Sequence, residues 1–328
     1  MWRATEEPNF AQDEKIWEIL DKLVIEQQAQ TERTWEFQEA LTPSERRKAE
    51  VVRNLYKPLT AKRVARAANS FKERTTRIGG IHPRHAGWLG HQLVDEANEA
   101  MACYLREVEN TGIFGAQDRM LAVLLLIKPT GGRRPISQFA SLYRVWGKAR
   151  KHDLAEWELE MLHDELFNTG QKRRTTDAVW RAEMRAEAAK KGGHEYLMLL
   201  WDLKQAFDLV GHEKLIAEAK ELQAPLKILR VLVAAYRWAR YLMLDGMLSQ
   251  PLWPQNGVAA GCWGALTALK VHLGRTLRRQ EHDYVRVMLT INVDDLLQEI
   301  EGEDAEEIVA IAKQAASHLL FRLTLLGM

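Results

Sequence analysis

Cysteine is scarce in this 328-residue chain, which contains only Cys103 and Cys262. Two cysteines cannot build the disulfide framework of a small secreted domain, so we expect a reducing compartment. Apolar runs are short as well, because the run over residues 121–127 is far below the ~20 residues that span a bilayer. The N-terminus lacks the basic and then apolar order of a signal peptide. These absences predict an intracellular protein, in the nucleus or cytoplasm, with no membrane partner.

The composition is that of a globular protein. Hydrophobic residues make up 46% of the chain and charged residues 28%, a balance that excludes global disorder. The length suits roughly two domains, or one domain with subdomains.

The net charge of +1 hides a strong segregation of charge along the chain. Residues 44–84 contain twelve Lys or Arg against three Asp or Glu, and residues 128–151 contain seven bases and no acid. Residues 299–307 contain six acids and no base. Basic surface beside acidic surface favours a polyanion held in a groove. Helices with one solvated basic face explain the first basic stretch equally well.

Hydrophobic periodicity and turn residues divide the chain into elements. Helices are predicted at residues 10–42, 44–74, 86–109, 140–166, 175–190 and, after a Gly-rich opening, 257–279. Strands are predicted at residues 120–128 and 134–139, joined by a turn, and at 195–203, 285–292 and 296–300.

Three aspartates stand at the ends of predicted strands. Asp202 ends the apolar run of residues 195–203, and Asp294 and Asp295 occupy the turn of the last hairpin. Adjacent carboxylates repel each other, and a divalent cation with oxygen ligands such as Mg²⁺ removes that penalty. If the strand of Asp202 pairs beside the hairpin, two metals ~3.5–4 Å apart could support an in-line phosphoryl transfer. A solvated turn is the alternative for Asp294 and Asp295 taken alone.

Five segments in order resemble the motifs of reverse transcriptases of the non-LTR retrotransposon and group II intron type. Residues 201–208 (WDLKQAFD) resemble the first catalytic motif, residues 257–262 (GVAAGC) the second, and residues 293–295 (VDD) the third. Upstream, residues 127–137 (IKPTGGRRPIS) are similar to the fingers motif, and residues 167–178 to the segment that follows it.

This resemblance implies an α+β fold, in which the fingers and palm of a right-hand polymerase carry a small antiparallel sheet backed by helices. It divides the chain into a helical N-terminal extension (1–110), a fingers-like region (111–192) and a palm (193–328). It implies template-directed DNA synthesis, with an RNA template, a DNA primer and dNTPs as partners and Mg²⁺ or Mn²⁺ as cofactor.

The resemblance also assigns roles residue by residue. Asp202, Asp294 and Asp295 would be catalytic and would bind metal together with the carbonyl of Leu203. Phe207 would lie under the sugar and exclude a 2′-hydroxyl. The other nucleotide-binding residues would be Lys128, Arg134, Gly257 and Gly261. The nucleic-acid-binding residues would be Arg133, Arg173 and Arg174.

The chain departs from the family pattern at three places. Val293 precedes the Asp pair where Ala or Met is usual, and Ala260 stands where a Gln is usual. After residue 328 no chain remains for a thumb, so a fragment or a degenerate copy is expected. Two alternatives therefore stay open: an RNA-dependent RNA polymerase, and a non-catalytic nucleic-acid-binding remnant of a retroelement.

Overall fold

The computed structural model of the chain describes residues 10–78, 80–92, 95–129, 131–162, 165–169, 173–244 and 246–328. Thr130 of the predicted fingers motif, and Gly170 and Gln171 of the segment after it, lie outside the described residues. The chain is an α+β protein in which 58% of the residues are helical and the sheets are small, as expected for a fingers–palm fold.

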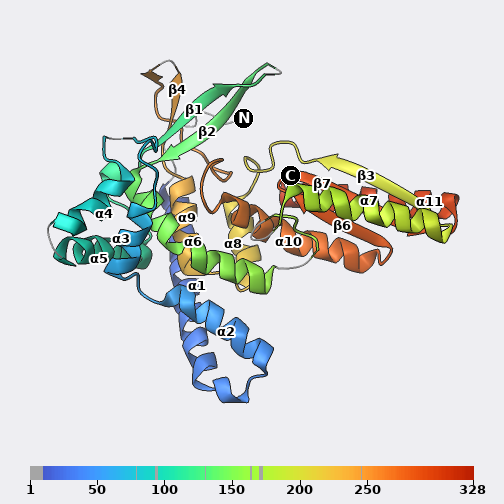
Figure 1. Cartoon of the computed structure of the whole chain (residues 1–328), viewed down its shortest axis with the longest axis horizontal. Coiled ribbons are helices and arrows are strands. Elements are labelled where there is room, and N and C mark those ends of the chain that lie inside the picture. Colours follow the sequence, from blue (N-terminus) through green and yellow to red (C-terminus); the bar gives the residue numbers. More distant parts are fainter. Residues whose placement is uncertain are drawn as a thin grey trace.

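Between residues 10 and 111 the described part of the chain is helical and contains no strand (Figure 1). They are α1 (Phe10–Glu36), α2 (Pro43–Tyr56), α3 (Ala61–Asn69), α4 (Pro83–Gln92) and α5 (Asp95–Thr111). The predicted continuous helix over 44–74 is wrong, because Pro58 holds Lys57 in an extended conformation and Thr60 then caps α3. These helices pack on the fingers helix α6 (Ser141–Met161) and on α9 (Leu226–Tyr236).

The fingers sheet has the strand order β2-β1-β4-β5. The predicted hairpin is confirmed: β1 (Leu121–Ile127) and β2 (Arg133–Phe139) pair antiparallel, and Figure 1 shows the hairpin projecting from the helices. The parallel partner of β1, β4 (Arg240–Leu244), and its short neighbour β5 (Met247–Leu248) were not predicted. Burial falls along β1, so the hairpin root is buried and Ile127 at the tip is 77% exposed.

The palm sheet has the strand order β3-β7-β6 and is antiparallel throughout. The strands are β3 (Glu195–Asp202), β6 (Val287–Asn292) and β7 (Asp295–Gly302). The predicted alternation is confirmed within β6, whose buried residues face the core, but Val285 lies before the strand and is 90% exposed. Trp201, at the inward-facing side of β3, packs against the same core.

Helices pack on this sheet from two sides (Figure 1), but Leu200 and Asp202 near the end of β3 stay exposed. On one side α7 (Thr175–Gly192) contacts β3 and β6, and on the other α10 (Ala265–Asp283) and α11 (Ala305–Leu326) contact the strands. The helix α8 (His212–Glu221) lies between α9 and α10. Neither α8, α9 nor α11 was predicted from the sequence.

By length and composition alone, the helix α11 is long and apolar enough to cross a membrane. Only 28% of its apolar 18-residue stretch is buried inside the protein. Its buried side chains, including Ile308, Ala315 and Leu319, pack in the palm core. One face of the helix therefore packs in the core of the protein. The absence of a membrane partner stays a prediction.

The predicted acidic surface at residues 299–307 requires a correction at its first residue. Glu299 lies in the middle of β7 and is fully buried. Its carboxylate accepts hydrogen bonds from Arg185 of α7 and from the hydroxyl of Tyr196 on β3. Because a buried carboxylate needs such partners, Glu299 joins α7 to the sheet and adds no charge to the surface.

A second buried ion pair joins the N-terminal helices to the fingers. The Glu109 carboxylate on α5 accepts hydrogen bonds from Arg150 Nε and Nη2, at 2.6 Å each, and from Trp146 Nε1 at 2.9 Å. Arg150 is fully buried, and Asp153 also accepts from it at 3.0 Å. The pair fixes α5 against α6, because neither charge has access to water.

We predict that Glu109→Leu destabilises the protein by about 3–5 kcal/mol, because it leaves the buried Arg150 without its main counter-charge. Urea denaturation would measure the free energy of unfolding. The matched control is Glu50→Gln, which removes an exposed pair with Arg47 and is expected to cost at most about 1 kcal/mol. Similar small losses in both variants would contradict the structural role of Glu109.

Candidate functional site

The palm sheet brings together the strand ends that carry the predicted aspartates. In the register of β3 and β7, Asp202 lies directly opposite Asp295. Opposite residues of antiparallel strands point to the same face with Cβ atoms about 5 Å apart. The hairpin turn closes over the end of β3, where the Leu203 N–H donates to the Asp294 carbonyl at 3.2 Å. The three aspartates predicted from distant parts of the sequence are therefore neighbours.

The hairpin turn makes Asp294 and Asp295 inequivalent, as predicted. Val293 and Asp294 form the turn between Asn292 and Asp295, which pair with each other. Val293 has a φ of +66°, a left-handed conformation that a β-branched residue rarely adopts. Such strain is concentrated at functional sites. Asp295 is exposed as the first residue of β7, and Asp294 is half-buried in the turn.

The three carboxylates are free to take an external counter-charge. Within the described residues, no hydrogen bond or ion pair holds the side chain of Asp202, Asp294 or Asp295. Oxygen ligands of this kind suit Mg²⁺. Among the described residues, no group of three or more His, Cys, Asp or Glu side chains forms a complete metal site. The three aspartates still suit Mg²⁺, because this cation is commonly held by one or two carboxylates together with waters and substrate phosphates.

The segment after Asp202 turns sharply away from the sheet. Leu203 is buried and accepts a hydrogen bond from the Ala206 N–H through its own carbonyl, at 3.2 Å. Gln205 has a φ of +57°. Phe207 is half-buried, and its ring packs against the core. The turn thereby places Phe207 close in sequence and space to the end of β3.

The loop of residues 257–262 connects this segment to the fingers. The Val258 N–H donates to the Phe207 carbonyl at 2.8 Å. At the other end of the loop, the Ser137 N–H of β2 donates to the Ala260 carbonyl at 2.9 Å. The loop is therefore a joint between the palm and the root of the fingers hairpin.

Both glycines of this loop are required by the protein's own packing. Gly257 has a φ of +89°, and a Cβ there would lie 2.8 Å from the Asp208 carbonyl oxygen. Gly261 has a φ of +97°, and a Cβ would lie 2.8 Å from the Ser137 carbonyl oxygen. Backbone approach to the protein itself explains these glycines, and their predicted contact with nucleotide stays a prediction.

The predicted phosphate-binding cations stand on the fingers hairpin. Lys128, Arg133 and Arg134 are all exposed near its tip. Arg133 Nη1 reaches back to the Leu125 carbonyl at 3.4 Å, across the hairpin. Three cations therefore lie near the tip of the hairpin, and the loop of residues 257–262 holds the root of the hairpin.

The remaining predicted cations lie at the start of α7. Arg173 is half-buried and donates through Nη1 to the Phe167 carbonyl. Arg174 is exposed, and its backbone N–H donates to the Asp177 carboxylate at 2.6 Å. Arg174 therefore keeps an exposed guanidinium, whereas Arg173 also serves the local fold.

Several residues that hold the site together were not predicted. His212, at the start of α8, and Tyr236, at the end of α9, both contact the 257–262 loop, and so does Tyr143 of α6. Nothing in the sequence distinguishes His212 from the other nine histidines. These contacts exist because three helices pack against the same loop. The residue pattern within each helix does not predict that packing.

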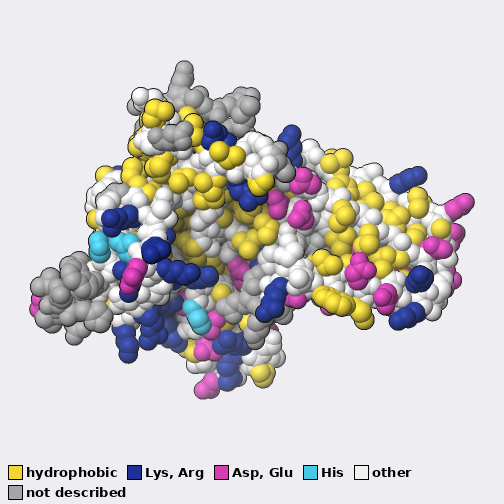
Figure 2. All heavy atoms as spheres, turned by 45° about the horizontal axis from the view of Figure 1, so that its top comes forward, with side chains coloured by type: hydrophobic (Ala, Val, Ile, Leu, Met, Phe, Trp, Pro, Cys, Tyr) yellow, Lys and Arg dark blue, Asp and Glu magenta, His cyan; other side chains and the backbone are white. Residues whose placement is uncertain are grey.

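Basic side chains are distributed unevenly over the surface of the molecule. Figure 2 shows Lys and Arg gathered over the half built from the N-terminal helices, and hydrophobic side chains spread over the palm half. The exposed palm residues include Leu200, which is 85% exposed on the same face of β3 as Asp202. For the basic stretch at residues 44–84, a groove for a polyanion and helices with one solvated basic face are both still supported. Many of its cations are exposed, and others are paired.

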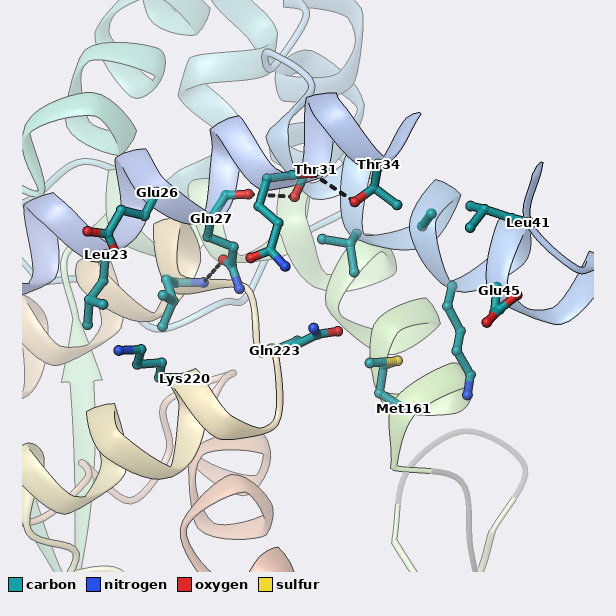
Figure 3. Close-up of a pocket in the computed structure, with 15 residues that line it drawn as sticks. Leu23, Glu26, Gln27, Thr31, Thr34, Leu41, Glu45, Met161, Lys220 and Gln223 are labelled. Atoms are coloured by element: carbon teal, nitrogen blue, oxygen red, sulfur yellow. Dashed lines mark hydrogen bonds between the residues drawn. The ribbon is translucent and has the colours of Figure 1, made fainter. Parts of the chain in front are cut away.

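A cavity of about 390 Å³ lies away from these residues, between α1, α2, the end of α6 and the turn from α8 to α9. Figure 3 shows Gln27 and Gln223 at its middle, Leu23 and Lys220 toward one end, and Met161 and Glu45 toward the other. None of the residues predicted for the site lines it.

We predict that Gly257→Ala destabilises the protein more than Gly131→Ala does. Gly131 has almost the same φ, +88°, but nothing lies within 4 Å of its added Cβ. Both variants should lose about 1–2 kcal/mol from the left-handed backbone, and Gly257→Ala about 1–3 kcal/mol more from the clash. Thermal or urea denaturation would measure the difference. Equal losses would show that close approach at Gly257 is unimportant.

The sequence of the chain matches the model of one known protein family. The family described as "Reverse transcriptase (RNA-dependent DNA polymerase)" matches residues 126–325, which include every residue predicted for the site. A search of curated proteins finds no match. The family match covers more than half of the chain, begins in the fingers hairpin and ends in α11. The chain therefore belongs to the reverse transcriptase family.

Proposed function

We propose that the chain carries out RNA-directed DNA synthesis of the non-LTR retrotransposon or group II intron type. The observation that supports this most is the pairing of Asp202 with Asp295 beside a turn that contains Asp294. Three carboxylates that have no counter-charge among the described residues lie at one end of the palm sheet, within a chain of this family. The motif order across residues 127–295 is the basis for the retroelement subtype.

In this proposal the aspartates hold two divalent cations, Mg²⁺ or Mn²⁺. Asp202 and Asp295, which lie opposite each other, would supply oxygens from two strands, and Asp294 and the Leu203 carbonyl would supply others. The cations, when bound, would neutralise the triphosphate and stabilise the charge that develops during transfer. The carboxylates themselves fix where that charge can be accommodated, because β3 and β7 hold them in register.

The other residues orient the substrates of the transfer. The primer 3′-hydroxyl attacks the α-phosphate of a dNTP, a new phosphodiester bond forms, and pyrophosphate leaves. Lys128 and Arg134 approach the triphosphate from the fingers, Lys as a point charge and Arg through paired N–H donors. Arg133, Arg173 and Arg174 contact the nucleic-acid backbone, where positive charge gives salt-dependent affinity.

Phe207 and the loop of residues 257–262 form the wall beside the sugar. The Phe207 carbonyl accepts a hydrogen bond from the Val258 N–H, so the backbone of Phe207 is fixed to the loop. In this position the ring excludes a 2′-hydroxyl and favours dNTPs over NTPs. An RNA-dependent RNA polymerase would need a smaller or polar side chain here.

We predict that Asp202→Asn and Asp295→Asn each lower primer extension by roughly a hundredfold or more, because metal-ion charge stabilisation is worth several kcal/mol. The assay would use an RNA template, a DNA primer and dNTPs with Mg²⁺ or Mn²⁺. Glu303→Gln, which removes an exposed acid after β7, is the matched control and should extend normally.

A second readout of these variants does not depend on turnover. Mg²⁺ should raise the melting temperature of the wild type, since a ligand that binds the folded state stabilises it. The rise should be lost in Asp202→Asn. A wild type that extends no primer but binds RNA–DNA duplex with a steep salt dependence would instead support the non-catalytic remnant.

We predict that Phe207→Ala lowers the preference for dNTP over NTP by about tenfold or more, because the ring no longer blocks the 2′-hydroxyl. The measure is the ratio of kcat/KM for dATP and ATP on one primer–template. Phe207→Tyr keeps a ring and should keep the preference. A wild type that prefers NTPs would favour the RNA polymerase alternative.

A further inference from the structure

The loop of residues 257–262 is held at both ends by buried side chains. At its first residue, His212 Nε2 lies 2.9 Å from the Gly257 carbonyl oxygen. At its last residue, the Cys262 Sγ lies 3.0 Å from the Tyr143 hydroxyl and 3.5 Å from that of Tyr236. The ring of Tyr236 also stacks on His212, with centroids 6.3 Å apart and an interplanar angle of 26°. One tyrosine therefore supports both ends of the loop.

The His212 ring acts as a hydrogen-bond donor. A carbonyl oxygen can only accept, so Nε2 carries a proton, and in the neutral ring Nδ1 therefore has none. Nδ1 is buried and has no partner among the described residues. An imidazole that leaves one nitrogen unsatisfied is a poor space-filling residue, because an apolar ring would occupy the same volume without that penalty. The bond to Gly257 is the feature that an apolar ring could not supply.

The charge state of His212 is fixed by its surroundings. The side chain is 3% exposed, and burial lowers its pKa to about 4, with a smaller contribution in the same direction from the positive charge of Arg240. The hydrogen bond to Gly257 opposes this shift. At neutral pH the ring is therefore uncharged, and it keeps the single donor that the loop needs.

Three hydrogen bonds tie the start of the loop to the segment 207–212. The Gly257 N–H donates to the Val210 carbonyl and the Val258 N–H to the Phe207 carbonyl, each at 2.8 Å. His212 closes the set by donating to the Gly257 carbonyl. Since a peptide group is planar, holding the Gly257 carbonyl also orients the Val258 N–H that reaches Phe207.

We propose that His212 is a positioning residue for the incoming nucleotide, which acts by fixing the Gly257–Val258 peptide against the backbone of Phe207. The proposal rests on the proposed function, in which Phe207 and this loop flank the sugar of the dNTP. His212 is fully enclosed and does not touch substrate itself. Its loss should therefore weaken nucleotide placement and leave the carboxylate site and primer–template binding intact.

Two substitutions separate the donor from the ring. His212→Phe keeps a ring that can stack on Tyr236 but removes the N–H, whereas His212→Gln keeps an N–H donor at similar reach and removes the ring. Steady-state primer extension, with dNTP concentration varied, would give KM and kcat for each variant. Melting temperature and affinity for RNA–DNA duplex would be measured alongside. We expect KM for dNTP to rise about tenfold in His212→Phe and to recover largely in His212→Gln, with duplex affinity unchanged.

The outcomes distinguish the two proposals. If the wild type extends primers and His212→Phe has a normal KM, the positioning role is overturned while the proposed function stands. If both variants lose activity in proportion to a loss of melting temperature, with no change in KM, His212 is only a structural residue and the inference is again overturned. If the wild type extends no primer, the proposed function fails, and the role of His212 fails with it.

Discussion

The pairing of β3 with β7 is the constraint on which the rest of the site depends. Successive residues of a strand point to opposite faces, so the register that packs Trp201 against the core also presents Asp202 to the exposed face, opposite Asp295. A slip by one residue would bury the carboxylate and expose the tryptophan. The apolar core therefore enforces the position of the proposed metal ligands, without any direct bond between the carboxylates.

The elements that define this register were predictable because their signals are local. Alternating burial in β6, the apolar run of β3 and the turn at residues 293–294 all appear in short stretches of sequence. The position of the aspartates at strand ends follows from them. The contact between the two strands required the family resemblance, since nothing in either strand alone names its partner.

What could not be predicted depends on partners distant in sequence. Glu299 reads as part of an acidic run, yet Arg185 and Tyr196 make its burial possible. Likewise Arg150 belongs to a stretch of seven bases without an acid, but Glu109 and Asp153 neutralise it inside the protein. Counting charges along the chain therefore overestimates the basic surface that nucleic acid could meet. β4 was missed for the same reason, because its parallel pairing with β1 spans more than a hundred residues.

The joint at residues 257–262 explains how the fingers and palm can act together. Ser137 at the buried root of β2 bonds to Ala260, while Gly261 packs against the Ser137 carbonyl and Gly257 against Asp208. The hairpin root is thus fixed to the loop that borders Phe207, and the exposed tip carries Lys128, Arg133 and Arg134. Because backbone contacts hold the root, the proposed approach of these cations to a triphosphate does not require the loop beside Phe207 to change. Close backbone contact at two glycines, rather than ionic attraction, holds the loop against the hairpin root and the segment after β3.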